Sequence, residues 1–506
     1  MTINLSSLTF TNQADVVPMF GPDDIVNTGI ANTLDGNDTI TGIWPPPNPS
    51  TLSGGYGIFN SGTLNTGEGK DIITGTGQYD FFNPSPASGS GIYNTGTLNT
   101  AEDNDIITGT GEFYGIYNTG TFNTAEGSDI ITAEGDYSRG IVNSGTFDTG
   151  EGNDIITATT GFSLGDGIYN TGTFNTAEGN DIITATGKER GIYNSAGNFN
   201  TADGNDEITG IASSFEGISI AKGSTFDTGK GKDRISGECG IGTGIYNGSL
   251  TFNTGDGNDT LDGLGGFYGI QNTGLINTGN GKDTIIAKGG TISTGAGSGL
   301  SNLSTIDTGH GDDIITASGG IENHGTIDTG DGDDIIAGIS SLSDGYQVIT
   351  GLYNFSNAGT INTGNGNDSI ISDRSLIIGT KGTINTGDGK DIIISNNGIE
   401  NDGTINTGDG ADFILVNGGF KGLGSVVLGN GKDYLNGFGS GNFNGGNNED
   451  TLELTKGTYT VGISGTTVSF TSSGVIMITS EFDQLKAGST TSPFSSLSHG
   501  QTINVP

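Results

Sequence analysis

The chain repeats one short acidic motif sixteen times: glycine, any residue, aspartate, any residue, and then an aliphatic residue. The stretches "NTGEGKDIITGTG" (65–77) and "DTGDGDDIIAG" (328–338) are two examples. Successive motif aspartates are 21 to 34 residues apart because the connecting segments differ in length. A fixed motif with variable spacers predicts a solenoid, with one supersecondary unit per repeat and insertions at a loop.

The residues after each motif aspartate predict a β-strand. Ile or Leu always stands two positions after the aspartate, while the position between them varies, as at Thr39 and Glu207. A period of two indicates a strand, and glycine at this density would cost a helix interior about 1 kcal/mol per residue. The motif aspartates are Asp38, Asp71, Asp105, Asp129, Asp154, Asp181, Asp206, Asp233, Asp259, Asp283, Asp313, Asp334, Asp368, Asp391, Asp412 and Asp433.

A short repeat, 391–411, divides into the three strand-like segments "DIIIS", "GIEN" and "GTIN". One such coil cannot cover its own apolar side, so we expect coils to stack in parallel. The fold class is therefore all-β: a parallel β-solenoid of about 16–17 coils with a small C-terminal β cap. We expect an N-terminal cap strand in 1–22, the solenoid in 23–440, a capping region in 441–488 and a Ser/Thr-rich tail in 489–506.

An asparagine column is expected at one corner of the stack, because Asn recurs two residues after a repeated Ile. Aligned Asn side chains can hydrogen-bond up and down a stack of parallel coils. The repeated residues are Asn60, Asn94, Asn118, Asn143, Asn170, Asn194 and Asn247.

The composition restricts the classes of partner. The 506 residues include 57 Asp and Glu against 17 Lys and Arg, a formal net charge of −40, which disfavours nucleic acid as a ligand. The single cysteine, Cys239, excludes a disulfide framework or a cysteine-based metal cluster. No apolar run approaches the roughly 20 residues of a membrane span. The acidic residues are either a solvated surface or a set of cation sites.

The glycines favour cation sites. Glycine stands two positions before the aspartate in fifteen of the sixteen motifs, which suggests positive φ or close backbone approach. Such a turn can aim carbonyl oxygens at one point beside a carboxylate, a set of hard ligands that suits Ca²⁺. Stacked aspartates about 4.8 Å apart would repel by about 3.5 kcal/mol per pair at an effective dielectric near 20. The alternative is that the aspartates cap turns and point to water.

The motif resembles the haemolysin-type calcium-binding repeat of RTX (repeats-in-toxin) proteins, in stretches such as "TGEGKDIIT", "TGDGNDTLD" and "LGNGKDYLN". The resemblance spans roughly residues 32–455 and implies that Ca²⁺ is held in one row, by the motif aspartates and carbonyls of the preceding glycines. Calcium occupancy would be weakest near Asp105, where Asp103 replaces the glycine two positions before the aspartate. The glycines are Gly36, Gly69, Gly152, Gly179, Gly204, Gly231, Gly257, Gly281, Gly311, Gly332, Gly366, Gly389, Gly410 and Gly431.

The tail in 489–506 resembles the uncleaved C-terminal signal of type I secreted RTX proteins, or it is a frayed capping pair. The first twenty residues lack the features of a Sec signal. The resemblance therefore implies an extracellular or cell-surface protein with a structural or adhesive role, folding as it binds Ca²⁺.

Catalysis is not expected. The histidines are His310, His324 and His499, and no nucleophile, base and acid can be defended from the sequence. The alternative is a parallel β-helix lyase or epimerase acting on polysaccharide. Varied exposed residues in the acidic loop, such as Glu68, Lys230 and His310, argue against ice binding by that face.

Aromatic residues gather in the insertions that follow "IIT", and a second aromatic column is expected nearby on one strand. They form either a surface for extracellular polysaccharide, a surface for self-assembly, or a cover for the sheet. The insertion residues are Trp44, Tyr79, Phe81, Phe82, Phe113, Tyr114, Tyr137, Phe162, Phe215, Phe267, Tyr268 and Tyr346, and the column is Phe59, Tyr93, Tyr117, Tyr169, Tyr193 and Tyr246.

Overall fold

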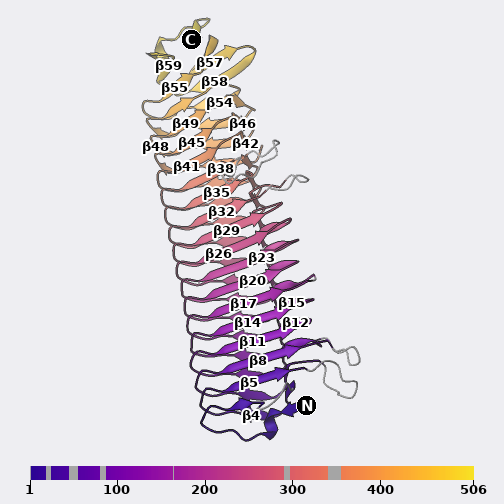
Figure 1. The fold of residues 1–506 in the computed structure, drawn as a ribbon. Helices are drawn as coiled ribbons and strands as arrows, with labels where there is room; N and C mark the ends of the chain where they lie inside the picture. The colour runs from indigo at the N-terminus through magenta and orange to yellow at the C-terminus, as the bar shows by residue number, and fades with distance from the viewer. Residues whose placement is uncertain are drawn as a thin grey trace. The chain divides into compact units, whose positions relative to one another are not determined.

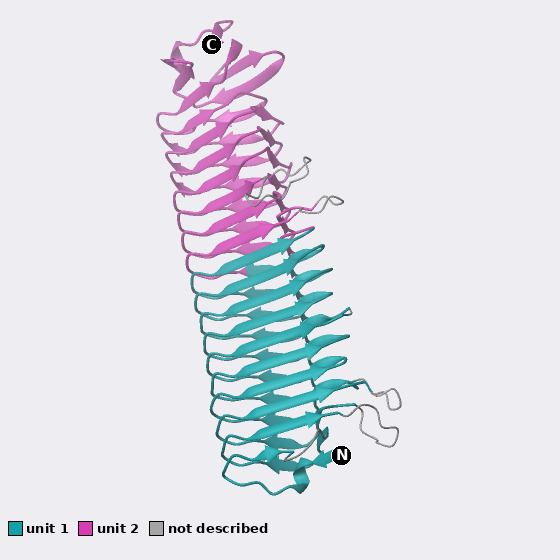
Figure 2. Cartoon of the chain, in the orientation of Figure 1, with its two compact units in different colours: residues 1–266, 274–276 teal, residues 267–273, 277–506 magenta. Residues whose placement is uncertain are grey.

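A computed structural model describes residues 2–18, 24–44, 55–79, 87–162, 164–289, 297–339 and 355–506. The chain forms two compact units (Figure 2). The first contains residues 1–266 and 274–276, and the second contains 267–273 and 277–506. The predicted Phe81, Phe82 and Tyr346 lie outside the described residues.

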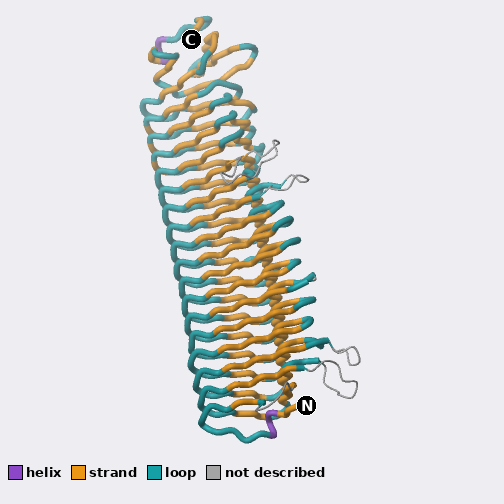
Figure 3. Tube along the Cα trace, viewed as in Figure 1, coloured by secondary structure: helices purple, strands orange, loops and turns teal. Residues whose placement is uncertain are grey.

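Both units are built from one repeated coil of three short strands joined by turns (Figures 1 and 3). In the coil that begins at Asp391 the strands are β45 (Ile392–Ser395), β46 (Ile399–Asn401) and β47 (Thr404–Asn406), as predicted. Equivalent strands of successive coils pair in parallel and in register, so that Ile393 lies beside Ile370 and Ile414. The predicted all-β parallel solenoid, of about 16 turns with antiparallel C-terminal strands, is confirmed.

In the first unit, the 3₁₀ turn η1 (Leu5–Ser7) follows the first strand, and the strands form three sheets that we call A, B and C. Sheet A contains β1 (Thr2–Asn4), β3 (Asp24–Asn27), β6 (Ile58–Asn60), β9 (Ser90–Asn94), β12 (Tyr114–Asn118), β15 (Arg139–Asn143), β18 (Asp166–Asn170), β21 (Arg190–Asn194), β24 (Glu216–Ile220) and β27 (Thr243–Asn247). Sheet B, which follows the motif aspartates, contains β2 (Val16–Val17), β5 (Thr39–Ile43), β8 (Ile72–Gly77), β11 (Ile106–Gly111), β14 (Ile130–Gly135), β17 (Ile155–Thr160), β20 (Ile182–Gly187), β23 (Glu207–Ala212), β26 (Arg234–Cys239) and β29 (Thr260–Gly265). Sheet C contains β4 (Ile30–Asn32), β7 (Thr63–Asn65), β10 (Thr97–Asn99), β13 (Thr121–Asn123), β16 (Thr146–Asp148), β19 (Thr173–Asn175), β22 (Asn198–Asn200), β25 (Thr225–Asp227) and β28 (Thr251–Asn253). One further strand, β31 (Leu275–Asn277), includes residues of both units.

The second unit repeats this arrangement. Its sheet A strands are β30 (Ile270–Asn272), β33 (Leu300–Asn302), β36 (Ile321–Asn323), β39 (Phe355–Asn357), β42 (Leu376–Ile378), β46 and β50 (Phe420–Lys421). Its sheet B strands are β32 (Thr284–Lys288), β35 (Ile314–Ser318), β38 (Ile335–Ile339), β41 (Ser369–Ser372), β45, β49 (Phe413–Val416), β53 (Tyr434–Asn436), β55 (Thr451–Leu454) and β59 (Gln484–Ala487). Its sheet C strands are β34 (Thr305–Asp307), β37 (Thr326–Asp328), β40 (Thr360–Asn362), β43 (Thr383–Asn385), β47, β51 (Ser425–Val427), β54 (Gly441–Asn444) and β58 (Val475–Ser480).

The core is made of inward columns that the period of two produces. In β8 the burial alternates, with Ile73 inside and Ile72 and Thr74 outside. The inward phenylalanines of sheet C stack on one another: Phe122 and Phe147 have ring centroids 4.5 Å apart with planes 6° apart, and the pair Phe147–Phe174 has a separation of 4.8 Å. All three rings are fully buried. Burial of one large apolar side chain per strand per coil is the main stabilising contribution.

The predicted asparagine column is confirmed as a buried ladder. The side-chain amide of Asn118 donates to Oδ1 of Asn143 at 2.9 Å and to the carbonyl of Thr146 at 2.7 Å, and it accepts from Asn94 at 2.8 Å. In the first unit the ladder is interrupted at Ile220, which takes the place of an asparagine beside Asn194. In the second unit the same ladder is present: Asn272 donates to Asn302 at 2.9 Å, and Asn302 donates to Asn323 at 2.8 Å. Each rung satisfies polar groups that would otherwise be buried without partners.

The C-terminal residues of the second unit turn from parallel to antiparallel pairing. The strands β56 (Gly457–Ser464), β57 (Thr467–Ser472) and β58 pair antiparallel, and β61 (Thr502–Val505) pairs with β56. The strand β60 (Thr490–Pro493) pairs with β59, and the 3₁₀ turn η2 (Phe494–Ser496) follows it. The Ser/Thr-rich tail in 489–506 therefore contributes two strands to the cap.

Candidate metal-binding column

The acidic loop joins the end of a sheet C strand to the start of the next sheet B strand, and its glycines are required for two reasons. Gly69 has φ +131° and Gly152 has φ +148°, values that L side chains rarely adopt. A Cβ at Gly152 would also collide with the carbonyl oxygen of Gly127, one coil earlier. Both explanations offered from the sequence, positive φ and close backbone approach, therefore hold at the same residue.

The loops that lack a glycine keep the same conformation. In five loops the residue four positions before the aspartate is not the usual glycine and has φ between 56° and 67°; these residues are Leu34, Ala101, Ala125, Ala177 and Ala202. In the motif before Asp105, Asp103 replaces the central glycine and has φ 91°. Each such residue costs about 1–2 kcal/mol, which the surrounding stack must supply.

The motif aspartates are buried and form a ladder. Their side chains are at most 2% exposed, so the alternative that they point to water is wrong. Within each unit the backbone N–H of one motif aspartate donates to Oδ1 of the next, for example from Asp71 to Asp105 at 2.8 Å and from Asp391 to Asp412 at 2.9 Å. The ladder begins at Asp15, which donates to Asp38, and includes Asp450, to which Asp433 donates. The predicted residues are thus brought into one column within each unit.

The second carboxylate oxygen of the motif aspartates, Oδ2, takes no part in this backbone ladder. In fourteen of the motif aspartates, among them Asp71, Asp154 and Asp391, and in Asp450, Oδ2 is buried and has no hydrogen-bond partner. A threonine five residues before the aspartate, Thr149 for Asp154, is fully buried and lies close enough to lower the pKa of the carboxyl. The Thr149 hydroxyl has no other hydrogen-bond partner. Its recurrence in fifteen of sixteen motifs, with Leu428 as the exception, is a signal that the sequence interpretation missed.

Burial raises the pKa of these carboxyls well above the ordinary value. The pKa of Asp181 rises to about 6, that of Asp206 to about 7 and that of Asp154 to about 8. Loss of hydration is the largest cause, the threonine and the preceding backbone N–H lower the value, and at Asp154 and Asp206 the neighbouring aspartates raise it further. A charged column without a counter-charge is therefore unfavourable at neutral pH.

A second ladder runs along the surface of the loops, in the opposite direction. The residue before the aspartate accepts a hydrogen bond from the backbone N–H of the next coil, as Asn153 does from Asn180 at 2.8 Å and Asn180 from Asn205 at 2.9 Å. The loops are therefore held from both sides, by the buried aspartates and by these exposed side chains.

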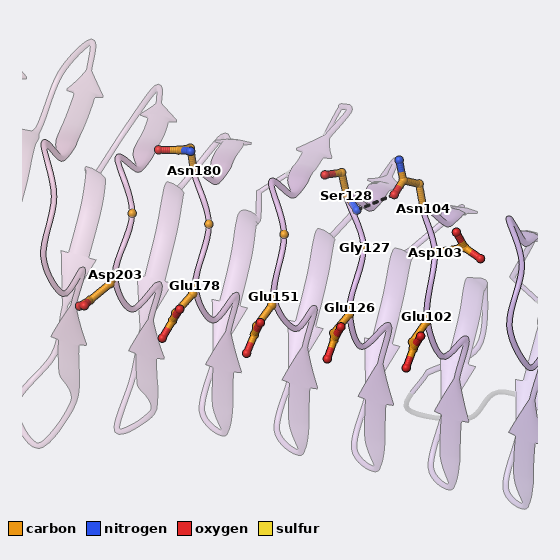
Figure 4. A pocket seen from close by; sticks show the side chains of 13 residues that line it. Glu102, Asp103, Asn104, Glu126, Gly127, Ser128, Glu151, Glu178, Asn180 and Asp203 are labelled. Atoms are coloured by element: carbon orange, nitrogen blue, oxygen red, sulfur yellow. Dashed lines mark hydrogen bonds between the residues drawn. The ribbon is translucent and has the colours of Figure 1, made fainter.

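The outer surface of five loops in the first unit forms an acidic groove (Figure 4). The carboxylates of Glu102, Glu126, Glu151, Glu178 and Asp203 lie in a row and point to the same side. They stand two residues after the repeated threonine, at the exposed position of the loop. They add negative charge outside the buried column.

The loops of three coils in the second unit differ. The segments β44 (Asp388–Gly389), β48 (Asp409–Gly410) and β52 (Asn430–Gly431) pair as a short parallel sheet. The glycine carbonyls there accept backbone hydrogen bonds, as Gly387 does from Asp409 at 3.0 Å and Gly408 from Asn430 at 2.9 Å. Carbonyl oxygens used in this way are less available as ligands.

Other candidate groups do not form a site. Within the described ranges, no three His, Cys, Asp or Glu side chains converge closely enough to hold a metal ion. His310 is exposed and lies 3.5 Å from Asp331, and His324 is exposed on a turn. Cys239 is buried, and Trp44, one of the aromatic insertion residues, is also buried, as the covering alternative expects. No helix in the part of the chain that the structure describes could cross a membrane.

Comparison with known proteins gives little beyond the architecture. No family model matches the chain, and no curated protein matches it. Among solved structures, the chain is similar to the crystal structure of a hyperactive, Ca²⁺-dependent, β-helical antifreeze protein from an Antarctic bacterium. The match has 15% identity, covers 72% of this chain and 76% of that chain, and has a TM-score of 0.26. A likeness of this degree carries no argument about ligand or role.

Proposed function

We propose that this chain is a calcium-binding solenoid of the RTX type, in which Ca²⁺ neutralises the aspartate column. The observation that supports the proposal is the buried Oδ2 without a hydrogen-bond partner in fourteen of the sixteen motif aspartates. A divalent cation at each loop would satisfy that oxygen and remove the repulsion between neighbouring carboxylates. The ligands would be the motif aspartates, from Asp38 to Asp433, with carbonyls of the loop glycines.

The donor set is compatible with Ca²⁺, which takes six to eight oxygen ligands. The loop before Asp154, like thirteen others, offers one free carboxylate oxygen and backbone carbonyls, and the chain has no cysteine or histidine in the column. Protonation is the alternative way to neutralise the column, because the neutral carboxyl of Asp154 could donate from Oδ2 to the Thr149 hydroxyl in its coil. Protonation and metal binding differ in their response to calcium and to pH.

We infer further that metal binding and folding are coupled, because the loops stack only in the folded chain. The role that fits a calcium-stabilised repeat with a charge of −40 is structural or adhesive, outside the cell, after export directed by the C-terminal residues. No constellation of nucleophile, base and acid supports a catalytic role among the described residues, so we propose a non-enzymatic one.

The test is a titration of the purified chain with Ca²⁺ after treatment with a chelator, with Mg²⁺ as the control. Circular dichroism should show a calcium-specific gain of β-structure, and calorimetry should show several ions bound per chain. If the chelated protein is fully folded at neutral pH and takes up no calcium, the proton is the neutralising group and the proposal is wrong.

A further inference from the structure

Aromatic side chains form an exposed ladder at the corner of the first unit where sheet B strands end and sheet A strands begin. We call it the corner ladder, and it contains Tyr79, Phe113, Tyr137 and Phe162. Successive ring centroids are 4.9, 6.2 and 6.4 Å apart, with planes tilted by 43° to 55°. The ladder therefore places one ring per coil over four consecutive coils.

The backbone fixes this alignment. The N–H of Tyr137 donates to the carbonyl of Glu112 at 2.9 Å, and the N–H of Phe162 donates to that of Asp136 at 2.7 Å. The N–H of Tyr79 donates to the Glu112 carboxylate at 2.7 Å. Because these bonds join turns of adjacent coils, the rings follow the stacking direction without depending on their contacts with one another.

The corner ladder continues onto the outer face of sheet A. Phe113 contacts Tyr114 at 6.4 Å, and Tyr114 contacts Tyr117 at 5.1 Å. Tyr117 in turn contacts Tyr93 at 5.4 Å. These sheet residues are half-buried, whereas Tyr137 is 48% exposed and Phe162 is 82% exposed. Within the ladder Tyr79 and Phe113 are half-buried as well, so the described turns leave Tyr137 and Phe162 exposed, and these two rings need another explanation.

The charges around the ladder select the class of ligand. Extended molecules that stack on a row of aromatic rings include single-stranded nucleic acids and polysaccharides. The ladder's own turns carry Glu112 and Asp136, and the chain has a net charge of −40, which repels nucleic acid, acidic glycans and a second copy of the chain. Two of the nearby cations are paired: Arg139 with Asp166 at 2.9 Å and Arg190 with Glu216 at 2.6 Å.

We propose that the corner ladder binds a neutral, linear polysaccharide lying along the stacking direction. The rings would contact the C–H faces of successive sugar units. The Tyr137 hydroxyl would donate to or accept from sugar hydroxyls, and the carboxylates of Glu112 and Asp136 would accept hydrogen bonds from them. This inference deepens the adhesive part of the proposed function and rests on it, since the ladder exists only in the folded solenoid.

The experiment is calorimetry on the calcium-treated full chain with cellohexaose, maltohexaose and a hexamer of galacturonate. We expect a neutral hexasaccharide to bind and the acidic one not to bind. The Tyr137→Ala/Phe162→Ala variant should weaken binding about tenfold or more, as expected for loss of a stacking ring. Leu423→Ser, at an 85% exposed position in the second unit, is the matched control and should leave binding unchanged.

Three results would overturn the inference. They are no binding of either neutral hexasaccharide by the folded chain, tighter binding of the acidic one, and binding that the double variant leaves intact. Sedimentation of the wild type and of Phe162→Ser gives an independent check, because self-association lost in the variant would make the ladder a contact between copies. Circular dichroism with and without calcium separates this outcome from failure of the metal proposal, since the ladder variants should keep the wild-type calcium response.

Discussion

The backbone N–H of Asp154 donates to Oδ1 of Asp181, one coil further along the chain, at 2.9 Å. Each motif aspartate therefore has two tasks: its carboxylate holds the preceding coil, and its own N–H holds the carboxylate of the following one. Only Oδ2 remains for a metal or a proton. The separate tasks of the two oxygens can be tested at one residue.

Two replacements of Asp181 distinguish its role as a hydrogen-bond acceptor from its role as a negative charge. Asp181→Asn keeps an oxygen for the Asp154 N–H but removes the charge, so we expect little change of stability in chelator and a loss of one or two bound Ca²⁺ in calcium. Asp181→Ala removes the acceptor too and should cost about 1–3 kcal/mol in either condition, since it leaves a buried N–H unpaired. Urea unfolding and calorimetry measure both effects. An Asn variant with the full calcium stoichiometry would contradict the assigned ligand.

The metal-free protein should become less stable as the pH rises. Burial raises the pKa of Asp154 from 3.8 to about 8 and that of Asp206 to about 7. The folded state therefore binds more protons than the unfolded state between about pH 4 and pH 8, so this stabilisation is complete below about pH 4 and is lost progressively as the pH rises to about 8. The free energy of unfolding should fall by up to about 1.4 kcal/mol per pH unit for each carboxyl whose pKa differs between the folded and the unfolded state.

Thermal unfolding in chelator at about pH 5, 7 and 9 checks this expectation. In calcium the fall of the melting temperature with rising pH should be partly reversed, because Ca²⁺ competes with the proton for the carboxylate and stabilises the fold more as the pH rises. A melting temperature in chelator that is constant from pH 5 to 9 would show that the carboxyls titrate normally.

Much of this architecture follows from the sequence, because the period of two and the spacing of the motif place the three strands of the repeated coil and the asparagine ladder. The direction of the aspartate side chain does not follow from them. Asp154 stands at the end of a loop, where glycines with positive φ reverse the alternation on which a strand pattern depends. The role of Thr149 was missed for a related reason, since a threonine beside a glycine turn is normally interpreted as a surface residue.

The aromatic loops show a second limit of sequence patterns. Trp44 and Phe162 both belong to insertions, yet Trp44 is 3% exposed and Phe162 is 82% exposed. Composition identifies an aromatic insertion, whereas burial depends on how the turn packs against its neighbours, which varies from coil to coil.

The loop conformation can be tested where alanine occupies a glycine position. Ala177 has φ 56°, so Ala177→Gly should raise the free energy of unfolding by about 0.5–1 kcal/mol through relief of the left-handed strain. The reverse change two residues later, Gly179→Ala, should be severely destabilising because its Cβ would meet the carbonyl of Gly152. Denaturant unfolding of both variants in calcium measures the difference. Equal stability of the two would show that the loops relax freely.

The asparagine ladder should contribute more per residue than the exposed ladder on the loops. Asn118→Ala removes an acceptor for Asn94 and two donors within a fully buried column, so we expect a loss of about 2–4 kcal/mol, from the cost of leaving several buried polar groups unpaired. Asn180→Ala removes an acceptor for the N–H of Asn205 at an exposed site, where water can replace the lost bond, so the loss should stay below about 1 kcal/mol. Urea unfolding in calcium gives both values on the same chain. A cost at Asn180 equal to that at Asn118 would mean that the surface ladder, rather than the buried column, sets the register of the coils.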